Sequence, residues 1–170
     1  MASLIEELID TLEKEYEVYQ QLIPIANNKT RVIVTNDLQS LQDITNLEQD
    51  AIDRINVLEH KRETVMVNIK TVISRREELT VKVLVDLLSN QPKEQRALSK
   101  VRDKLRTAIL TFNQINNQNK SLIQQSLEMI EFNMNFIQST RMSPGNNTYT
   151  KGASRYEMQA RGTGMFDAKQ

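Results

Sequence analysis

The sequence predicts an all-α fold, an elongated antiparallel helical bundle or coiled coil with a flexible C-terminal tail. The chain has 170 residues, and its four glycines (Gly145, Gly152, Gly162 and Gly164) all follow residue 140, which argues against a β-rich fold with tight turns. Before residue 140, apolar residues recur every three or four positions, which is the helical period. Tryptophan is absent, and only four phenylalanines and four tyrosines occur, which favours helices packed side by side through Leu, Ile and Val.

The composition changes at Arg-Met-Ser-Pro-Gly, residues 141–145, and this divides the chain into a helical body and a tail. The body, 1–140, is expected to hold helices at about 2–34, 37–76, 78–89 (short) and 92–140. The tail, 141–170, has a composition typical of disorder.

The first helix is predicted from one apolar face, and Pro24 is expected to kink or end it nearby. That face comprises Ile5, Leu8, Leu12, Tyr16, Tyr19, Ile23 and Ala26.

The second helix is expected to begin near Asn36-Asp37, since both residue types are good N-caps. It continues with an unbroken alternation of three- and four-residue steps, the spacing of a coiled coil. These positions are Leu41, Ile44, Glu48, Ala51, Ile55, Leu58, Arg62, Val65, Ile69 and Val72. The next apolar stretch, 77–90, is short and predicts a short helix or a packed connector.

The last helix is expected to begin at Pro92, a residue favoured in the first turn of a helix. It carries two parallel stripes, and together they are wider than a two-helix seam requires. This helix therefore contacts more than one neighbour or leaves surface for another molecule. The first stripe comprises Leu98, Val101, Leu105, Ala108, Phe112, Ile115, Asn119, Leu122, Ser126, Met129, Asn133 and Phe136. The second comprises Ile109, Asn116, Ile123, Leu127, Ile130, Met134 and Ile137.

Composition and charge exclude several classes of function. The 22 basic and 22 acidic side chains cancel, so the net charge predicts no nucleic-acid partner, and without cysteine no disulfide or thiolate metal site can form. The N-terminal MASLIEELID is acidic and amphipathic, unlike a secretory signal, and no apolar run is long enough to insert into a membrane. The absence of cysteine suits a reducing cytosol.

No catalytic, metal or cofactor site is predicted. His60 is the only histidine, so neither a catalytic triad nor a histidine metal cluster can be built, and Glu128 and Glu131 have no histidine partner. Gly162-Thr163-Gly164 lacks the surroundings of a phosphate-binding loop. The basic run at 100–106 is distributed around its helix, as on a solvated face.

Six of the seven residues from Asn113 to Asn119 carry side-chain amides, and none is charged. One interpretation is that a buried Asn sets the register of the helices. The other is a groove for an amphipathic helix of another protein, in which apolar anchors surround neutral amides. Its predicted binding residues are Phe112, Ile115, Asn116, Asn119, Leu122, Ile123, Met129 and Ile130.

Two stretches, 28–66 and 111–123, resemble the FlgN-type flagellar export chaperones. The first contains a Leu-x-x-Leu helix that ends in a Leu-Glu-x-x-Arg element, here Leu58 to Arg62, and the second contains Asn-x-x-Asn-x-x-Leu-Leu, here Asn116 to Ile123. The tail, with Phe-Asp-Ala-Lys before its last residue, resembles the Gram-positive members.

The resemblance implies a cytosolic, non-enzymatic chaperone. Such a protein would bind C-terminal amphipathic helices of the hook–filament junction proteins (hook-associated proteins) and deliver them to the flagellar export gate. Tyr149 and Phe166 in the tail are candidates for docking to the export machinery. Two alternatives stay open: a structural coiled-coil scaffold or stalk that forms a homo-oligomer through the 41–72 seam, and an enzyme whose site the pattern does not reveal.

Overall fold

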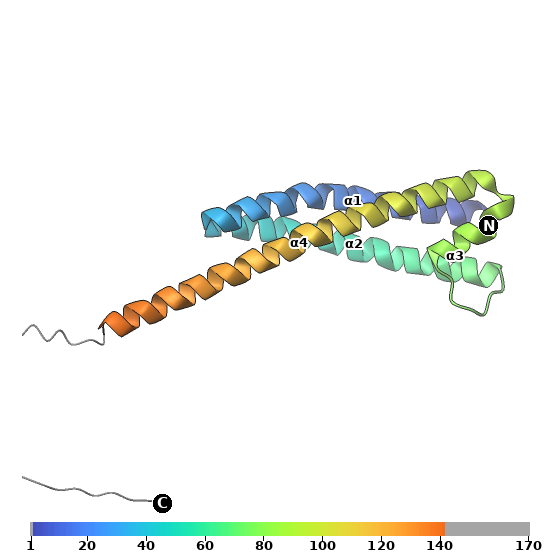
Figure 1. Ribbon diagram of the computed structural model, residues 1–170. Helices are drawn as coiled ribbons and strands as arrows, with labels where there is room; N and C mark the ends of the chain where they lie inside the picture. Colours follow the sequence, from blue (N-terminus) through green and yellow to red (C-terminus); the bar gives the residue numbers. More distant parts are fainter. Residues whose placement is uncertain (1, 142–170) are drawn as a thin grey trace, which may run out of the picture. The chain divides into compact units, whose positions relative to one another are not determined.

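The computed structural model describes residues 2–141, and every element in that range is helical, which confirms the predicted all-α class (Figure 1). The elements are α1 (Ala2–Thr35), α2 (Leu38–Val72), α3 (Val81–Leu87), the 3-10 turn η1 (Leu88–Asn90) and α4 (Pro92–Arg141). The chain divides into two units, Met1–Asn133 and Met134–Gln170, and the described part of the second unit is the end of α4. None of the helices within 2–141 is long and apolar enough to cross a membrane.

α1 and α2 form an antiparallel hairpin in the first unit. Lys29 pairs with Glu48 near the turn (2.5 Å), and Glu7 pairs with Lys61 near the open end (3.5 Å). The turn needs no glycine because Asn36 adopts the left-handed conformation, with φ of 54°.

The hydrogen bonds around this turn hold both helix ends. The backbone N–H groups of Asn36 and Asp37 donate to the carbonyls of Ile33 and Val32, each at 3.2 Å, and this closes α1 with a Schellman motif. The Asp37 carboxylate then accepts the backbone N–H of Ser40 at 3.1 Å, which is the N-cap bond predicted for α2.

α1 continues through Pro24 to Thr35, so Pro24 does not end the helix. Proline removes one backbone donor, and the carbonyl that loses its partner is that of Gln20. Both Pro24 and Gln20 are exposed, so water can reach that carbonyl. Leu22 and Ala26, on either side of the proline, are fully buried and hold the helix against its neighbours.

α2 ends at Val72, four residues before the predicted end at 76, because Ser74 is left-handed, with φ of 52°. Within the 77–90 segment, α3 covers Val81–Leu87 and η1 covers Leu88–Asn90. Leu84, Val85 and Leu88 are buried, so this connector seals one end of the bundle core.

α4 lies along α1 and runs in the same direction. Three contacts show this, because the residue numbers increase together on the two helices: Tyr16 with Lys104, Tyr19 with Phe112, and Thr30 with Asn119. The first unit is therefore a three-helix bundle. Its larger core cluster takes residues from the three long helices, from α3 and from η1: Ile5, Leu8, Leu12, Val65, Ile69, Leu84, Val85, Leu88, Leu98, Val101 and Leu105. A second cluster comprises Val18, Leu22, Ala51 and Ile55.

A charged residue, Glu15, is buried in this bundle, and the sequence pattern did not predict it. Arg62 Nε lies 3.3 Å from Glu15 Oε1, although no hydrogen bond to that oxygen forms within the described residues, and Arg62 also lies 3.7 Å from Glu59. Burial raises the pKa of Glu15 to about 7, against the attraction of Arg62, and the negative charge of Glu59 raises it further. The Leu-Glu-x-x-Arg element thus supplies both charged neighbours of a buried carboxyl group.

We predict that the free energy of unfolding falls as pH rises from about 5 to 8. The folded state keeps a proton on Glu15 up to about pH 7, whereas the unfolded chain releases it near the ordinary pKa of 4.5. The stability from this protonated form is therefore lost as pH rises through that window. Glu15→Gln should remove about 2 kcal/mol of the decline, measured by urea denaturation at several pH values. An equal decline in Glu15→Gln and in the exposed control Glu13→Gln would contradict the assignment.

Candidate functional site

Phe112, the first of the eight predicted binding residues, is partly buried in the bundle. Its ring meets Tyr19 edge to face, with centroids 5.8 Å apart and an interplanar angle of 65°, and it packs against the second core cluster. A polar substitution at Phe112 would therefore disturb packing as well as any binding. Ile115 and Leu122, further along α4, are also partly buried.

Asn119 lies inside the bundle, only 1% exposed. Its Nδ2 donates to the Ala26 carbonyl at 2.8 Å, and its Oδ1 accepts the Thr30 hydroxyl at 2.6 Å. Both ends of the amide are thus satisfied by α1. The structure places Asn119 where the register interpretation expects a buried asparagine, and the residue also lines a hollow beside Asn116 and Ile123.

The other amides of this stretch face solvent: Asn113, Gln114, Asn116, Asn117 and Gln118 are all exposed. Asn116 lies at the edge of a hollow of about 280 Å³, together with Lys29, Lys120, Ile123 and Gln124. The amide-rich stretch is therefore split, with one member fixing the bundle and the rest forming a neutral polar surface.

The tip of the α1–α2 hairpin forms an apolar hollow of about 130 Å³ against α4. Its apolar lining comes from all three helices: Val32 and Ile33 of α1, Leu38 and Leu41 of α2, and Ile123, Leu127 and Ile130 of α4. Of these, Leu38 is 78% exposed. The hollow thus joins two predicted binding residues, Ile123 and Ile130, to hairpin residues that the sequence did not single out for binding.

Beyond Ser126, α4 presents large apolar side chains to solvent. Leu127, Met129, Ile130 and Phe132, which we call the α4 strip, are each more than half exposed. Isolated exposed apolar residues are ordinary, but Leu127 and Ile130 share the face of α4 that lines the apolar hollow, and this continuity marks an interaction surface. Met129 and Phe132 continue around the helix, so the four residues span about 220° of its circumference and one partner helix cannot cover all of them at once. Met129 and Ile130, like Asn116, are predicted binding residues that the structure leaves exposed.

Charges lie at the rim of this surface rather than within it. Hydrogen bonds from the Ser40 hydroxyl and backbone N–H lower the pKa of Asp37, so its carboxylate at the edge of the hollow stays ionised near neutral pH. On α4, Glu128 is exposed and accepts a hydrogen bond from Gln124 at 3.0 Å. Asp37 and Glu128 therefore place negative charge beside the apolar surface, and exposed Lys120 places a positive charge beside Ile123.

The surface suits non-covalent recognition. Within 2–141 no group of three His, Cys, Asp or Glu side chains is placed to hold a metal ion, and the side chain of His60 is 85% exposed. Phe132, Leu127 and the hairpin tip were not among the predicted binding residues, because periodicity cannot show where along α4 its partners end. Tyr149 and Phe166, the candidate docking residues, lie outside the described residues.

We predict that Asn119→Ala destabilises the bundle by about 1–3 kcal/mol, because it removes both hydrogen bonds of this amide to α1 and leaves the Thr30 hydroxyl only the longer bond to the Ala26 carbonyl, at 3.2 Å. Urea denaturation would measure the change, and the matched control is Asn116→Ala, an exposed amide one turn away that should change stability by about 0.5 kcal/mol or less. Equal effects in the two variants would show that the buried amide does not set the packing.

Comparison with known proteins identifies the family of this chain. The model of the FlgN protein family matches residues 1–157. Searches of curated proteins and of solved structures return no match. Because the family match covers most of the chain, the protein belongs to the FlgN family of flagellar export chaperones.

Proposed function

We propose that this protein acts in the cytoplasm, binds the C-terminal amphipathic helices of hook–filament junction proteins, and delivers these proteins to the flagellar export gate. The observation that carries the proposal is the α4 strip beside the hollow at the hairpin tip, an exposed apolar surface on a chain of the FlgN family. An amphipathic helix is the kind of ligand that such a surface recognises.

The size of the strip suits reversible binding. One partner helix can cover about two of the four side chains at a time, and each has about half its surface left to bury, which is worth about 1 kcal/mol each. An equal contribution from the partner gives about 4 kcal/mol before the entropy of ordering the partner helix is subtracted. The net affinity is then millimolar or weaker, unless the hollow contributes further contacts. A chaperone must release its cargo, so reversible binding fits the role.

The residue types of the surface fit the same role. Met129 has an unbranched, polarisable side chain that can adapt to more than one apolar partner. The exposed amides between Asn113 and Gln118 offer hydrogen bonds without extending the apolar surface, which limits association between empty copies.

Replacing both Met129 and Ile130 by Asp should weaken cargo binding at least tenfold, because two charges would have to be buried under the partner helix. Calorimetric titration with peptides from the C-terminal helices of the junction proteins would measure this, and wild-type binding should show a negative heat-capacity change. The matched control is Leu110→Asp, which is on the same helix and equally exposed but far from the strip. Both variants should retain the circular dichroism of the wild type.

Unchanged affinity in the double variant would refute the proposed site. Light scattering tests the scaffold alternative. That alternative would be favoured if the wild type forms a stable homo-oligomer and the same two substitutions dissociate it. In that case the strip would serve a second copy of this chain.

For delivery, we propose that Tyr149 and Phe166 contact the export machinery. A chain truncated after Arg141 should then bind cargo peptides with wild-type affinity but fail to support export of the junction proteins. The double variant Tyr149→Ala/Phe166→Ala in the full-length chain should show the same export defect. Reduced peptide affinity after truncation would instead assign the tail to the cargo surface.

A further inference from the structure

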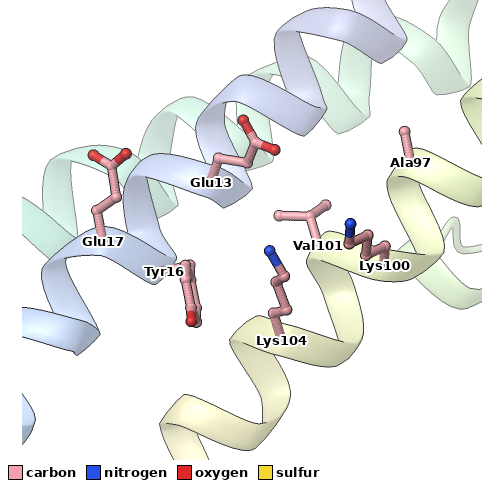
Figure 2. A pocket seen from close by; sticks show the side chains of 7 residues that line it. All are labelled: Glu13, Tyr16, Glu17, Ala97, Lys100, Val101 and Lys104. Carbon is pink, nitrogen blue, oxygen red and sulfur yellow. The ribbon is translucent and has the colours of Figure 1, made fainter.

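A second surface lies between α1 and the first half of α4, away from the α4 strip. A groove of about 490 Å³ there is lined by Glu13, Tyr16 and Glu17 of α1 and by Ala97, Lys100, Val101 and Lys104 of α4, whose side chains are drawn in Figure 2. A neighbouring hollow of about 620 Å³ shares Tyr16, Lys100 and Lys104 and extends to Ile23 and Thr111. The two form one continuous groove that spans about 21 Å on the α4 side, from Ala97 to Thr111.

The two walls of the groove carry opposite charges. Glu13 and Glu17 project from α1, and Lys100 and Lys104 project from α4 (Figure 2). All four are exposed, and no ion pair within 4 Å joins them to each other or to another described residue. The Lys104 ammonium lies 5.6 Å from the centre of the Tyr16 ring, which keeps it at the groove.

Asp103 also lines the α4 side but does not cancel the basic wall. Its carboxylate pairs with the Arg102 guanidinium on the same helix at 2.8 Å. The groove therefore offers a row of negative charge on one side and a row of positive charge on the other, each available to a partner.

The spacing of the lining residues is that of a helix-binding groove. On α1 the lining positions advance from Glu13 through Tyr16 and Gln20 to Ile23, in steps of three or four. On α4 they advance in the same way through Ala97, Lys100, Lys104, Thr107 or Ala108, and Thr111. Small residues at Ala97, Thr107, Ala108 and Thr111 let another backbone approach closely. The bundle thus has a place for a fourth helix of about four turns.

We propose that this groove binds an amphipathic helix of another protein that carries acidic residues along one edge of its apolar seam and basic residues along the other. The acidic edge faces Lys100 and Lys104, and the basic edge faces Glu13 and Glu17, in the manner of flanking charges in a coiled coil. Tyr16 and Ile23 supply the apolar contact. The inference does not depend on the cargo proposal, because no residue of the α4 strip takes part.

Three designed 21-residue helical peptides with the same alanine and leucine seam test the proposal against the full chain. One has an acidic and a basic edge, one has two basic edges, and one has two acidic edges. Fluorescence anisotropy at physiological salt should show that the mixed-edge peptide binds at least fivefold more tightly than either of the others. The preference should shrink at about 1 M salt because the charges are exposed.

Charge reversal gives the sharper result. Lys100→Glu/Lys104→Glu makes both walls acidic, so the peptide with two basic edges should become the tightest. Glu13→Lys/Glu17→Lys makes both walls basic, so the peptide with two acidic edges should become the tightest. The control Lys93→Glu/Arg106→Glu makes the same change in net charge at exposed positions outside the groove, and the mixed-edge peptide should remain the tightest.

The proposal is overturned if no peptide binds, or if the order of the three peptides is the same in the wild type and both charge reversals. It is also overturned if the wild type forms a homo-oligomer that Lys100→Glu/Lys104→Glu dissociates, since the occupant would then be a second copy. Each variant should bind the cargo peptides with wild-type affinity, so failure here is separate from failure of the proposed function.

Discussion

The hydrogen bonds of Asn119 to α1 determine where α4 lies along the hairpin. An unpaired amide in an apolar interface costs about 1–3 kcal/mol, so a shift of α4 by one turn would be disfavoured even where the apolar packing remained similar. Leu and Ile seams alone discriminate poorly between registers. With Asn119 held beside Ala26 and Thr30, the residues that follow it reach the hairpin tip at Ile123. The position of the hollow and of the α4 strip both follow from this contact.

The polar side chains inside the bundle differ in how completely they are hydrogen-bonded. Asn119 is fully satisfied, and Lys29 and Glu48 pair directly across the hairpin. Glu15 is different, because it is buried beside Arg62 with one oxygen lacking a hydrogen bond, and its raised pKa reflects that cost. Buried charge of this kind contributes little net stability. Arg62 and Glu59 of the Leu-Glu-x-x-Arg element on α2 are the charged neighbours of Glu15 on α1, so the residues that resemble the FlgN pattern include structural ones.

The three-helix arrangement leaves two surfaces of different character. The α4 strip and the hairpin-tip hollow are apolar, and their recognition energy would come from burial. The groove between α1 and α4 has a small apolar floor between two charged walls, so it would select its partner by charge pattern more than by area. A chaperone that both holds cargo and meets other components benefits from surfaces that do not compete for the same ligand.

The sequence by itself determined the helices and the two-residue turn. Three- and four-residue spacing without glycine allows little else, and Asn36-Asp37 suits both a left-handed cap and an N-cap. It also showed that α4 has more apolar face than one neighbour can cover. Only the tertiary structure decided which part of that face is buried. Phe112 and Asn119 pack inside the bundle, whereas Met129 and Ile130 are exposed. The reason is that periodicity records which residues share a face, whereas burial depends on where along α4 the neighbouring hairpin ends.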